Sequence, residues 1–464
     1  MQNHPLGISK RTSLRLQIPS RPKKPSLKLG ILLMGVSSLS QAASPIAGSL
    51  TDLPGLNATQ TNMASVIEVV CPQGPKPEGP NTQAFQDRCN AMVGAAQSGS
   101  SAAAVGALKE TAPEQMIGQG TGATRTSFNV IGGRLAALRA GVRGFQVAGF
   151  NTGSQPQTKL ASQSLHGETG GSAGETGTDL WTRLGGFVNG TYNTGNLDSS
   201  STQTGYNFNS GNTTIGLDYR LTKDLILGTA FTYVRSEASF NLNGGSLNSN
   251  AYTGAVYGTY YATEELYFEG ITTFGGINYE STRNIQYSVP GDNVNTQATA
   301  NPNGNQYSVS LGSGYNFALQ EWTLNPYARV NYLKFDVDSF NENGGNGWAM
   351  GFSDQSVESV TTTLGSQISY AFSTSFGVFL PSIRGEWTHQ YKDNIRNIAG
   401  RFLGSSPINF NTVTQAPDRN YFTVGTGVSG TFARGVSAFL NYDALVGYRD
   451  ITSHLVTLGA RVEF

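Results

Sequence analysis

The hydrophobic pattern of the second part of the chain repeats every two residues. In residues 435–448, Val436, Leu440 and Val446 share one parity, whereas Asn441 and Asp443 share the other. This alternation predicts β-strands that have one apolar face and one polar face. We expect twelve such strands, at residues 180–193, 206–221, 225–240, 247–262, 265–282, 304–318, 321–336, 353–371, 374–391, 418–433, 435–448 and 450–464.

The connections between these strands alternate between short and long. Tight turns are expected at residues 222–224, 263–264, 319–320, 373 and 434–435. Longer polar segments are expected at residues 194–205, 241–247, 282–303, 341–351 and 392–418. Short turns at one end and long loops at the other are typical of outer-membrane barrels, whose short turns are periplasmic.

Charged residues deep within the strands indicate a polar interior. In residues 374–391, Arg384 and Glu386 have the parity opposite to that of Ile383 and Trp387. A charge facing lipid at mid-membrane would cost about 2–4 kcal/mol, so these charges favour a wet lumen. In hydrocarbon every backbone polar group must be bonded internally, so the first strand should pair with the last. Residues 180–464 therefore predict an all-β, 12-stranded antiparallel transmembrane β-barrel.

The composition agrees with this fold class. The chain has 464 residues, 58 glycines, 10% aromatic residues, 13% charged residues and a mean hydropathy of −0.25. It has no run of the roughly 18 apolar residues that a transmembrane helix needs. Seven basic residues precede the first acid, Asp52, so the remainder of the chain is net acidic. A nucleic-acid partner is therefore not expected.

The N-terminal residues have the layout of a secretory signal peptide. Residues 29–39 are mostly apolar, a basic segment precedes them, and Ser40-Gln41-Ala42-Ala43 follows. We expect a signal peptide at residues 1–42 that directs export through the Sec translocon; a buried N-terminal helix is the alternative. Export leads to an oxidising compartment, so Cys71 and Cys89 are expected to form a disulfide. Closing that loop would stabilise the segment by about 3 kcal/mol.

Residues 43–125 are expected to be a short helical segment that contains this disulfide. Residues 126–150 carry an apolar stripe at helical spacing and three arginines, Arg134, Arg139 and Arg143. Two interpretations of this helix stay open. It packs on the surface against its neighbours, or it lies in the barrel lumen with its arginines paired to lumen carboxylates. Residues 151–179 are a Gly/Ser-rich flexible linker.

Several strand segments resemble a known family. They are residues 324–328 (Leu-Asn-Pro-Tyr-Ala), 338–344 (Asp-Ser-Phe-Asn-Glu-Asn-Gly), 363–367 (Thr-Leu-Gly-Ser-Gln) and 381–391, which contain Trp-Thr-His-Gln-Tyr. In this order and spacing they resemble the C-terminal β-domain of autotransporters (type V secretion). The end of the chain is similar to that family's signal for the barrel-assembly machinery, with Thr457, Gly459, Val462 and Phe464 at the matching positions.

The resemblance implies a Gram-negative outer-membrane protein that anchors, displays or translocates a small N-terminal segment. That segment would be periplasmic or surface-exposed, and its display could serve adhesion, with the surface ligand unidentified. The expected partners are outer-membrane lipid, the barrel-assembly machinery and the Sec translocon. A passive porin-like channel is the first alternative function.

The sequence shows no catalytic motif. It contains no Gly-x-Ser-x-Gly or His-Glu-x-x-His motif, and its histidines are His4, His166, His389 and His454. A barrel-embedded hydrolase, the second alternative, would need a histidine at the extracellular rim, and none of the long loops contains one. His389 is expected to be a structural polar residue on the outer face rather than part of a triad. We expect no enzymatic activity, no cofactor and no metal site.

Overall fold

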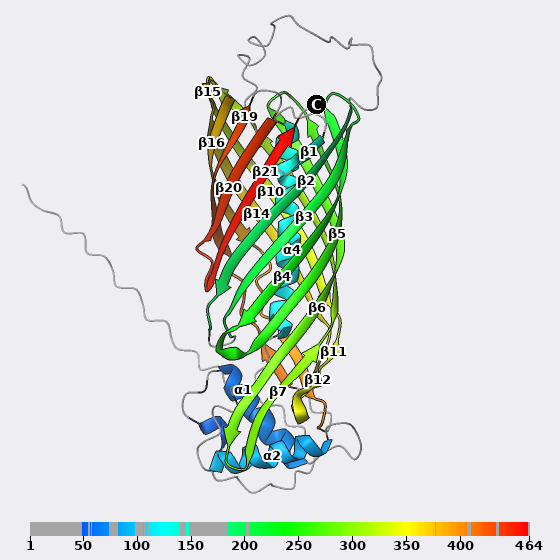
Figure 1. Ribbon diagram of the computed structural model, residues 1–464, viewed down its shortest axis with the longest axis vertical. Coiled ribbons are helices and arrows are strands. Elements are labelled where there is room, and N and C mark those ends of the chain that lie inside the picture. The colour runs from blue at the N-terminus through cyan, green and yellow to red at the C-terminus, as the bar shows by residue number, and fades with distance from the viewer. Residues whose placement is uncertain are drawn as a thin grey trace, which may run out of the picture. The chain divides into compact units, whose positions relative to one another are not determined.

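The computed structural model describes residues 49–53, 56, 58–73, 82–97, 105, 108, 112–139, 145–147, 183–200, 204–375, 377–405, 410–432 and 436–462. The expected signal peptide, residues 1–42, and the expected linker, residues 151–179, lie outside the described residues. In the described part, helices come first and a large sheet follows (Figure 1).

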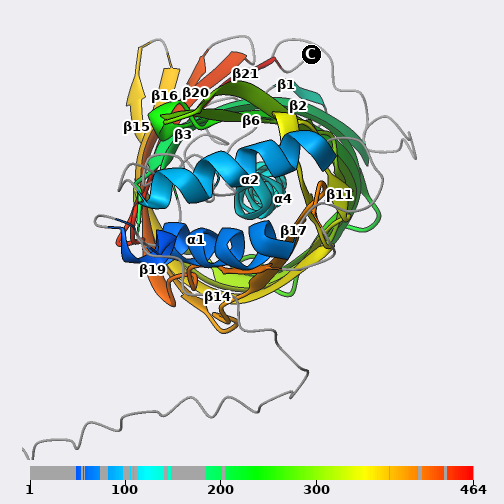
Figure 2. The same cartoon turned by 90° about the horizontal axis from the view of Figure 1, so that it is seen from below.

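Twelve antiparallel strands form a closed barrel, so the expected fold class is confirmed (Figure 2). Each strand pairs with the next, and the first pairs with the last from Gly190 opposite Leu458 to Leu197 opposite Ile451. The barrel strands are β2 (Leu184–Leu197), β3 (Tyr206–Arg220), β4 (Leu225–Phe240), β5 (Gly245–Tyr261), β6 (Leu266–Val289), β8 (Asn303–Tyr315), β10 (Trp322–Val337), β14 (Gln355–Tyr370), β16 (Gly377–Gln390), β19 (Asn420–Phe432), β20 (Val436–Val446) and β21 (Ile451–Val462).

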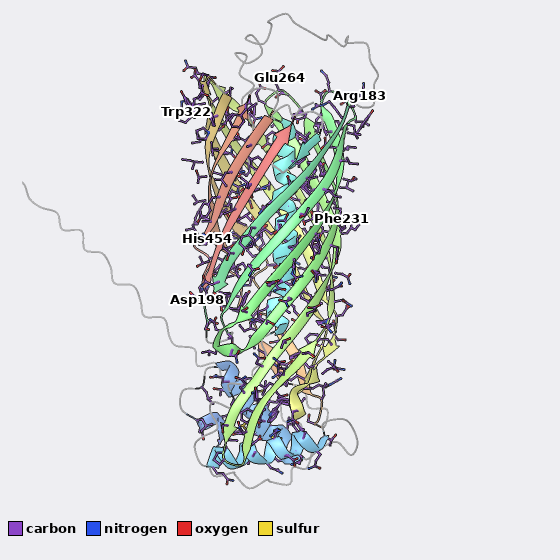
Figure 3. The ribbon with its side chains drawn as sticks, in the orientation of Figure 1. Arg183, Asp198, Phe231, Glu264, Trp322 and His454 are labelled. Carbon is purple, nitrogen blue, oxygen red and sulfur yellow. A yellow bond between two sulfur atoms is a disulfide. The ribbon has the colours of Figure 1, made fainter. Side chains whose placement is uncertain are left out.

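Side chains alternate between the two faces of this wall. Ile383 and Leu458 are each 66% exposed on the outside, whereas Asn441 and Asp443 are buried on the inside. Figure 3 labels Glu264 at the end of the barrel with the short turns and Asp198 at the end with the long loops. We call these the short-turn end and the long-loop end. The predicted parity of β16 and β20 matches the observed faces.

Exposed aromatic side chains gather at two levels on the outside. The level near the short-turn end contains Tyr260, Phe268, Phe317, Trp322 and Phe372. The other level, which we call the outer aromatic ring, contains Tyr192, Tyr252, Phe274, Tyr307 and Tyr391. Exposed aliphatic side chains occupy the belt between the two levels. Strands that continue past the outer aromatic ring carry exposed ion pairs, such as Arg235 with Glu237 on β4.

The long loops contain more regular structure than the sequence predicted. β6 continues to Val289 and forms a hairpin with β7 (Asp292–Ala300), so the expected loop at residues 282–303 is wrong. Gly291 in that turn has a φ of +85°, which favours glycine. Further short elements are β11 (Phe340–Asn341), β12 (Asn343–Gly344), η4 (Gly345–Gly347), β13 (Met350–Phe352), β17 (Asn397–Phe402) and β18 (Phe410–Val413).

These short strands and the β6–β7 hairpin form for a common physical reason. The inward faces of the β6–β7 hairpin, β13, β17 and β18 pack against N-terminal helices, so a partner distant in sequence stabilises them. The first barrel strand also differs from its expected range, 180–193, because β2 pairs with β3 as far as Leu197 opposite Tyr206. At the short-turn end, β9 (Phe317–Leu319) and β15 (Phe372–Thr374) extend two hairpins.

The N-terminal part contains η1 (Leu50–Asp52), α1 (Ala58–Val70), η2 (Cys71–Gln73), α2 (Thr82–Gln97) and α4 (Ala112–Arg139). β1 (Phe145–Val147) then pairs in parallel with β2, Phe145 opposite Gly186. The helix expected at residues 126–150 therefore begins earlier and ends earlier, and Phe145 lies in a strand instead. Among the described residues, none of the helices combines the length and the apolar character that crossing a bilayer requires.

Candidate functional site: the lumen helix and the covered mouth

Helix α4 lies inside the barrel, as the end-on view shows (Figure 2). Near the long-loop end, the Tyr279 hydroxyl donates a 2.6 Å hydrogen bond to the Met116 carbonyl oxygen. The Gln119 side-chain amide donates a 2.9 Å bond to the Leu247 carbonyl oxygen. These bonds come from strands β6 and β5, so the helix is held on that part of the wall.

Gly120 allows the helix to approach the wall closely. A Cβ atom at this position would lie 2.1 Å from Cζ of Phe335 on β10, far inside van der Waals contact. Met116, Tyr279 and Phe335 belong to one buried apolar cluster around the first turns of α4. Gly120 lowers the helix propensity of this segment, but the close packing against Phe335 requires it.

The middle of α4 makes polar contacts with opposite sides of the wall. The Thr124 hydroxyl donates to Gln306 on β8, and Gln306 donates a 3.1 Å bond to Thr253 on β5. Arg125 donates a 3.3 Å bond to the hydroxyl of Tyr421 on β19, and its guanidinium carbon lies 5.6 Å from that ring centroid. The helix thus contacts both halves of the barrel.

Arg134 fixes the end of α4 nearest the short turns. It is fully buried and forms two hydrogen bonds with Asp218 on β3, 2.7 Å from Nε to Oδ2 and 3.0 Å from Nη2 to Oδ1. The Tyr257 hydroxyl donates a 3.2 Å bond to the same carboxylate. The guanidinium carbon also lies 5.4 Å from the ring centroid of Phe187. This geometry pairs a buried cation with a buried anion in two parallel bonds.

The three arginines singled out from the sequence have different places. Arg134 lies in the lumen and pairs with a lumen carboxylate, as the second of the two interpretations requires. Arg139 is the last residue of α4, and its side chain lies outside the described residues. Arg143 also lies outside them. The sequence analysis did not predict Asp218 as a partner of Arg134. Its position between Leu217 and Tyr219, which have the outward parity, indicated that its side chain points into the lumen.

A charged network lines the lumen on the other wall. Arg384 on β16 lies 2.5 Å from Asp443 on β20 and 3.8 Å from Glu386. Glu386 in turn lies 2.5 Å from Arg329 on β10 and accepts a 2.6 Å bond from the Tyr327 hydroxyl. The two cations and two anions of this network balance one another.

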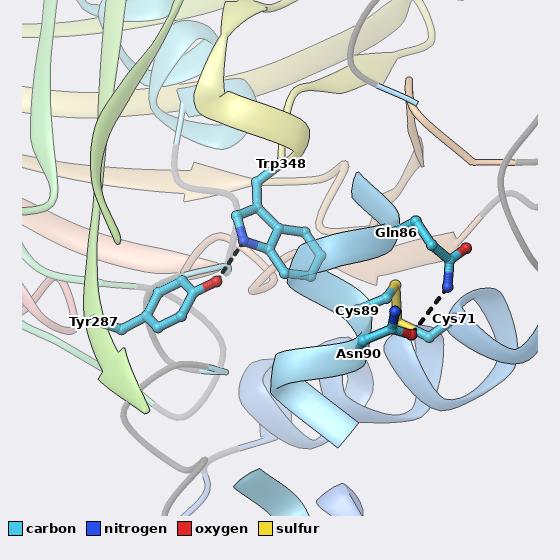
Figure 4. Close-up of a disulfide and its surroundings, with 6 residues drawn as sticks. All are labelled: Cys71, Gln86, Cys89, Asn90, Tyr287 and Trp348. Carbon is cyan, nitrogen blue, oxygen red and sulfur yellow. Dashed lines mark hydrogen bonds between the residues drawn. A yellow bond between two sulfur atoms is a disulfide. The ribbon is translucent and has the colours of Figure 1, made fainter. Parts of the chain in front are cut away.

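At the long-loop end, η1, α1, η2 and α2 (residues 49–97) form what we call the helical module. A disulfide joins Cys71 in η2 to Cys89 in α2, with 18 residues of sequence separation (Figure 4). Met63 and Ile67 of α1 and Phe85 and Met92 of α2 are buried. The disulfide thus ties the two helices together beside this apolar core.

The barrel loops supply the other half of the module's core. Phe85 packs edge-on against Trp348 at 5.7 Å between ring centroids and lies 5.7 Å from Phe402. The Trp348 indole donates a 2.8 Å bond to the Tyr287 hydroxyl, which donates a 3.0 Å bond to Asp292 (Figure 4). Burial raises the pKa of Tyr287, so its hydroxyl keeps its proton and can donate.

Two ion pairs hold this arrangement. Arg88 of α2 pairs with Asp292 at the start of β7. Arg283 of β6 is buried and forms bonds of 2.9 and 2.6 Å with the Glu342 carboxylate. Arg283 also donates a 2.9 Å bond to the Trp348 carbonyl oxygen, which fixes the loop carrying that indole. Sequence reasoning missed this pair because its members are 59 residues apart.

The remaining residues singled out from the sequence are in strands. His389 contacts Asn420 at 2.8 Å and His454 contacts the Tyr442 hydroxyl at 2.6 Å, both at exposed positions. Thr457 is buried on β21, and Gly459 and Val462 lie on the same strand; Phe464 is outside the described residues.

Comparisons with known proteins agree with this architecture. A family model described as the autotransporter β-domain matches residues 186–443. Esterase EstA of Pseudomonas aeruginosa is 24% identical over 293 residues, which are 61% of this chain and 44% of that protein. Lipase 1 of Photorhabdus luminescens is 24% identical over 269 residues, which are 56% of this chain and 39% of that protein. The chain thus spans less than half the length of these relatives.

Solved structures of translocator domains are also similar. The translocator domain of the autotransporter NalP from Neisseria meningitidis has a TM-score of 0.48 at 15% identity, covering 61% of this chain and 89% of that one. The β-domain of the Bordetella autotransporter BrkA has a TM-score of 0.45 at 16% identity, covering 61% of this chain and 100% of that one. Because the family model covers more than half of the sequence, the chain belongs to the autotransporter β-domain family, whose barrels lie in the outer membrane.

Proposed function

We propose that this barrel anchors the helical module on the outer surface of the cell and keeps its own lumen filled with α4. Long loops of outer-membrane barrels are extracellular, and the module packs among the long loops here. Helix α4 leads from that end to the short-turn end, where Arg134 is bonded to Asp218. The chain would therefore cross the membrane once through its own barrel.

The observation that carries this proposal is the shared apolar core of module and loops. Phe85 of the module contacts Trp348 and Phe402 of the barrel loops, and all three side chains are buried. Releasing the module would expose both halves of this core to water, at about 25 cal/mol for each Å² of apolar surface. The module is thus built for display on the barrel rather than for release.

The same geometry argues against the alternative functions. A porin-like channel needs an open lumen, whereas α4 contacts strands on both sides of it. The names of two relatives contain an esterase and a lipase activity. This chain spans less than half of each of those proteins, so the names do not favour a hydrolase here. We propose that the barrel acts as an anchor without catalysis. An adhesive role of the displayed module stays a prediction.

Assembly and lipid contact follow from the outer surface. The belt of exposed aliphatic side chains, such as Ile383 and Leu458, would face the lipid. Thr457, Gly459, Val462 and Phe464 would be recognised by the barrel-assembly machinery after export through the Sec translocon. Replacing Val462 and Phe464 by serine should then leave the chain unassembled, as judged by its protease sensitivity in cell extracts.

The direct test is cysteine labelling of intact cells. Cys71 and Cys89 are bonded to each other, so an added cysteine is the reactive thiol. Gln97→Cys, at the exposed end of α2, should react with a membrane-impermeant maleimide on intact cells. Lys223→Cys, in a short turn and 90% exposed, should react only after the outer membrane is permeabilised. The reverse labelling pattern would refute surface display.

A further inference from the structure

The first and last strands of the barrel pair along only part of their length. Their register runs from Leu197 opposite Ile451 to Gly190 opposite Leu458. β21 continues to Val462, but among the described strands residues 459–462 pair with β20 alone. β2 also continues toward the short-turn end, where it pairs with β3. Direct pairing across the seam between β2 and β21 therefore stops before the strands do.

The short strand β1 occupies the edge of β2 that β21 leaves. Residues 145–147 lie opposite residues 186–188, whose other edge is already paired with β3. β1 lies beside both β2 and β21 (Figures 1 and 2). If the register of β2 and β21 continued, residues 460–462 would lie opposite the same residues 186–188. One edge of a strand pairs with one neighbour, so β1 and the end of β21 compete for this edge.

Pairing alone favours β21 in this competition. Continued antiparallel pairing would add four residues of β21, 459–462, whereas β1 pairs three residues in parallel, which is slightly less stable per residue. β1 has the advantage of a short tether. Residues 140–144 separate it from Arg139, the last residue of α4, so it lies within about 20 Å of the helix end. Such a tether gives β1 a high effective concentration at β2.

The anchor of α4 lies directly beside the competed edge. Asp218, which holds Arg134 in two hydrogen bonds, lies opposite Gly185 on β2, one residue before the segment that pairs with β1. A helix seated by this ion pair therefore brings β1 to its site. If α4 left the lumen, the edge at residues 186–188 would lose its partner, and an unpaired strand edge is costly in a membrane.

We propose that β1 is an exchangeable seam strand, which couples the position of α4 to the pairing of the last strand. With α4 seated, β1 pairs with residues 186–188 and keeps the end of β21 off β2. With α4 withdrawn, residues 459–462 pair with β2 in its place. The edge of β2 is paired in both states, so the lumen helix can enter or leave without opening the wall.

Disulfide cross-linking of protein in lipid bilayers distinguishes the two states. Val188→Cys with Val147→Cys forms the β1 pair, and Val188→Cys with Ala460→Cys forms the β21 pair. In the matching state each pair has Cα atoms about 5 Å apart, which suits a disulfide. Tyr192→Cys with Val456→Cys lies opposite in both states and is the control pair. Mass spectrometry of non-reduced peptides after oxidation gives the yield of each link.

Removing the pairing of β1 is the first perturbation. With no further change, the β1 pair and the control pair should link and the β21 pair should not. Gln146→Pro removes the middle N–H group of β1 and should lower the yield of the β1 pair about tenfold. The β21 pair should then link as fully as the control pair. Gln146→Ala keeps that N–H group and should change neither yield.

A second variant guards against an effect of proline on assembly. Phe145→Gly/Val147→Gly lowers the strand propensity of β1 instead and should also make the β21 pair link. The proposal is overturned if the β21 pair links as well as the control pair before any change to β1. It is equally overturned if the β21 pair stays unlinked in a variant whose β1 is removed and whose control pair links.

Releasing the helix end tests the coupling to α4. Asp218→Ala removes the partner of Arg134 and should shift the yields from the β1 pair toward the β21 pair, as Gln146→Pro does. Glu237→Ala breaks an exposed ion pair on β4 and should leave both yields unchanged. If Asp218→Ala and Glu237→Ala gave the same ratio of the two links, β1 would not be coupled to the helix and the proposal would fail.

Discussion

The contact between Arg134 and Asp218 gives the sharpest test of the lumen helix. Arg134 is fully buried and Asp218 is 5% exposed, and two hydrogen bonds of 2.7 and 3.0 Å join them. Removing one member leaves the other as an uncompensated buried charge, which costs about 3–5 kcal/mol. We therefore expect Arg134→Ala or Asp218→Ala to lower the free energy of unfolding by that amount.

The matched control is the pair of Arg235 and Glu237 on the outer face of β4. Their side chains are 60% and 47% exposed, and an exposed pair of this kind contributes about 0–1 kcal/mol. Arg235→Ala should therefore be close to neutral. The double variant Arg134→Met/Asp218→Leu should cost less than the sum of the two single alanine changes, because no charge is left buried.

Two measurements on protein in lipid bilayers check these values. Urea titration gives the free energy of unfolding, and single-channel recording gives the conductance. Arg134→Ala should also raise the conductance, since α4 loses its anchor at the short-turn end. The reasoning is refuted if Arg134→Ala costs no more than Arg235→Ala, or if the costs at Arg134 and Asp218 are simply additive.

Three further predictions concern the helix and the module. Gly120→Ala places a Cβ 2.1 Å from Phe335 and should destabilise the barrel by about 1–3 kcal/mol, whereas Gly122→Ala, with open space, should stabilise it slightly in the same urea titration. Cys89→Ser should cost the module about 3 kcal/mol, seen as faster proteolysis of residues 49–97 while the barrel stays resistant. Burial raises the pKa of Tyr287, so the module should lose stability as the pH rises above the ordinary tyrosine value of about 10. Denaturant titrations at several pH values measure this loss, and Tyr287→Phe should make it smaller. An unchanged pH profile for Tyr287→Phe would show that the loss of stability at high pH does not come from Tyr287.

The number and the faces of the barrel strands could be predicted from the sequence. The side-chain period of a strand is two, so Ile383 and Arg384 must point to opposite faces. Lipid accepts one of these residues and a wet lumen the other, which fixes the direction of the whole strand. The strong alternation of β16, β20 and β21 exists because each face meets one uniform environment.

The long loops could not be predicted in the same way. The outward residues of the β6–β7 hairpin face water instead of lipid, and Asn284 and Asn295 look like loop residues in a sequence. Their strand conformation depends on the opposite face, where Ile285 and Tyr287 pack against the helical module. That contact joins segments about 200 residues apart, as Arg88 and Asp292 show.

The sequence by itself determined a closed barrel with a polar inside, because local periodicity reports the polarity of the two surroundings of each strand. Only the tertiary structure decided where α4 lies and where it begins. Its first turns contain Gly118, Gly120 and Gly122, which intrinsic helix propensity disfavours. Close packing against Phe335 and the buried bond between Arg134 and Asp218 outweigh that propensity, and both depend on residues far away in the sequence.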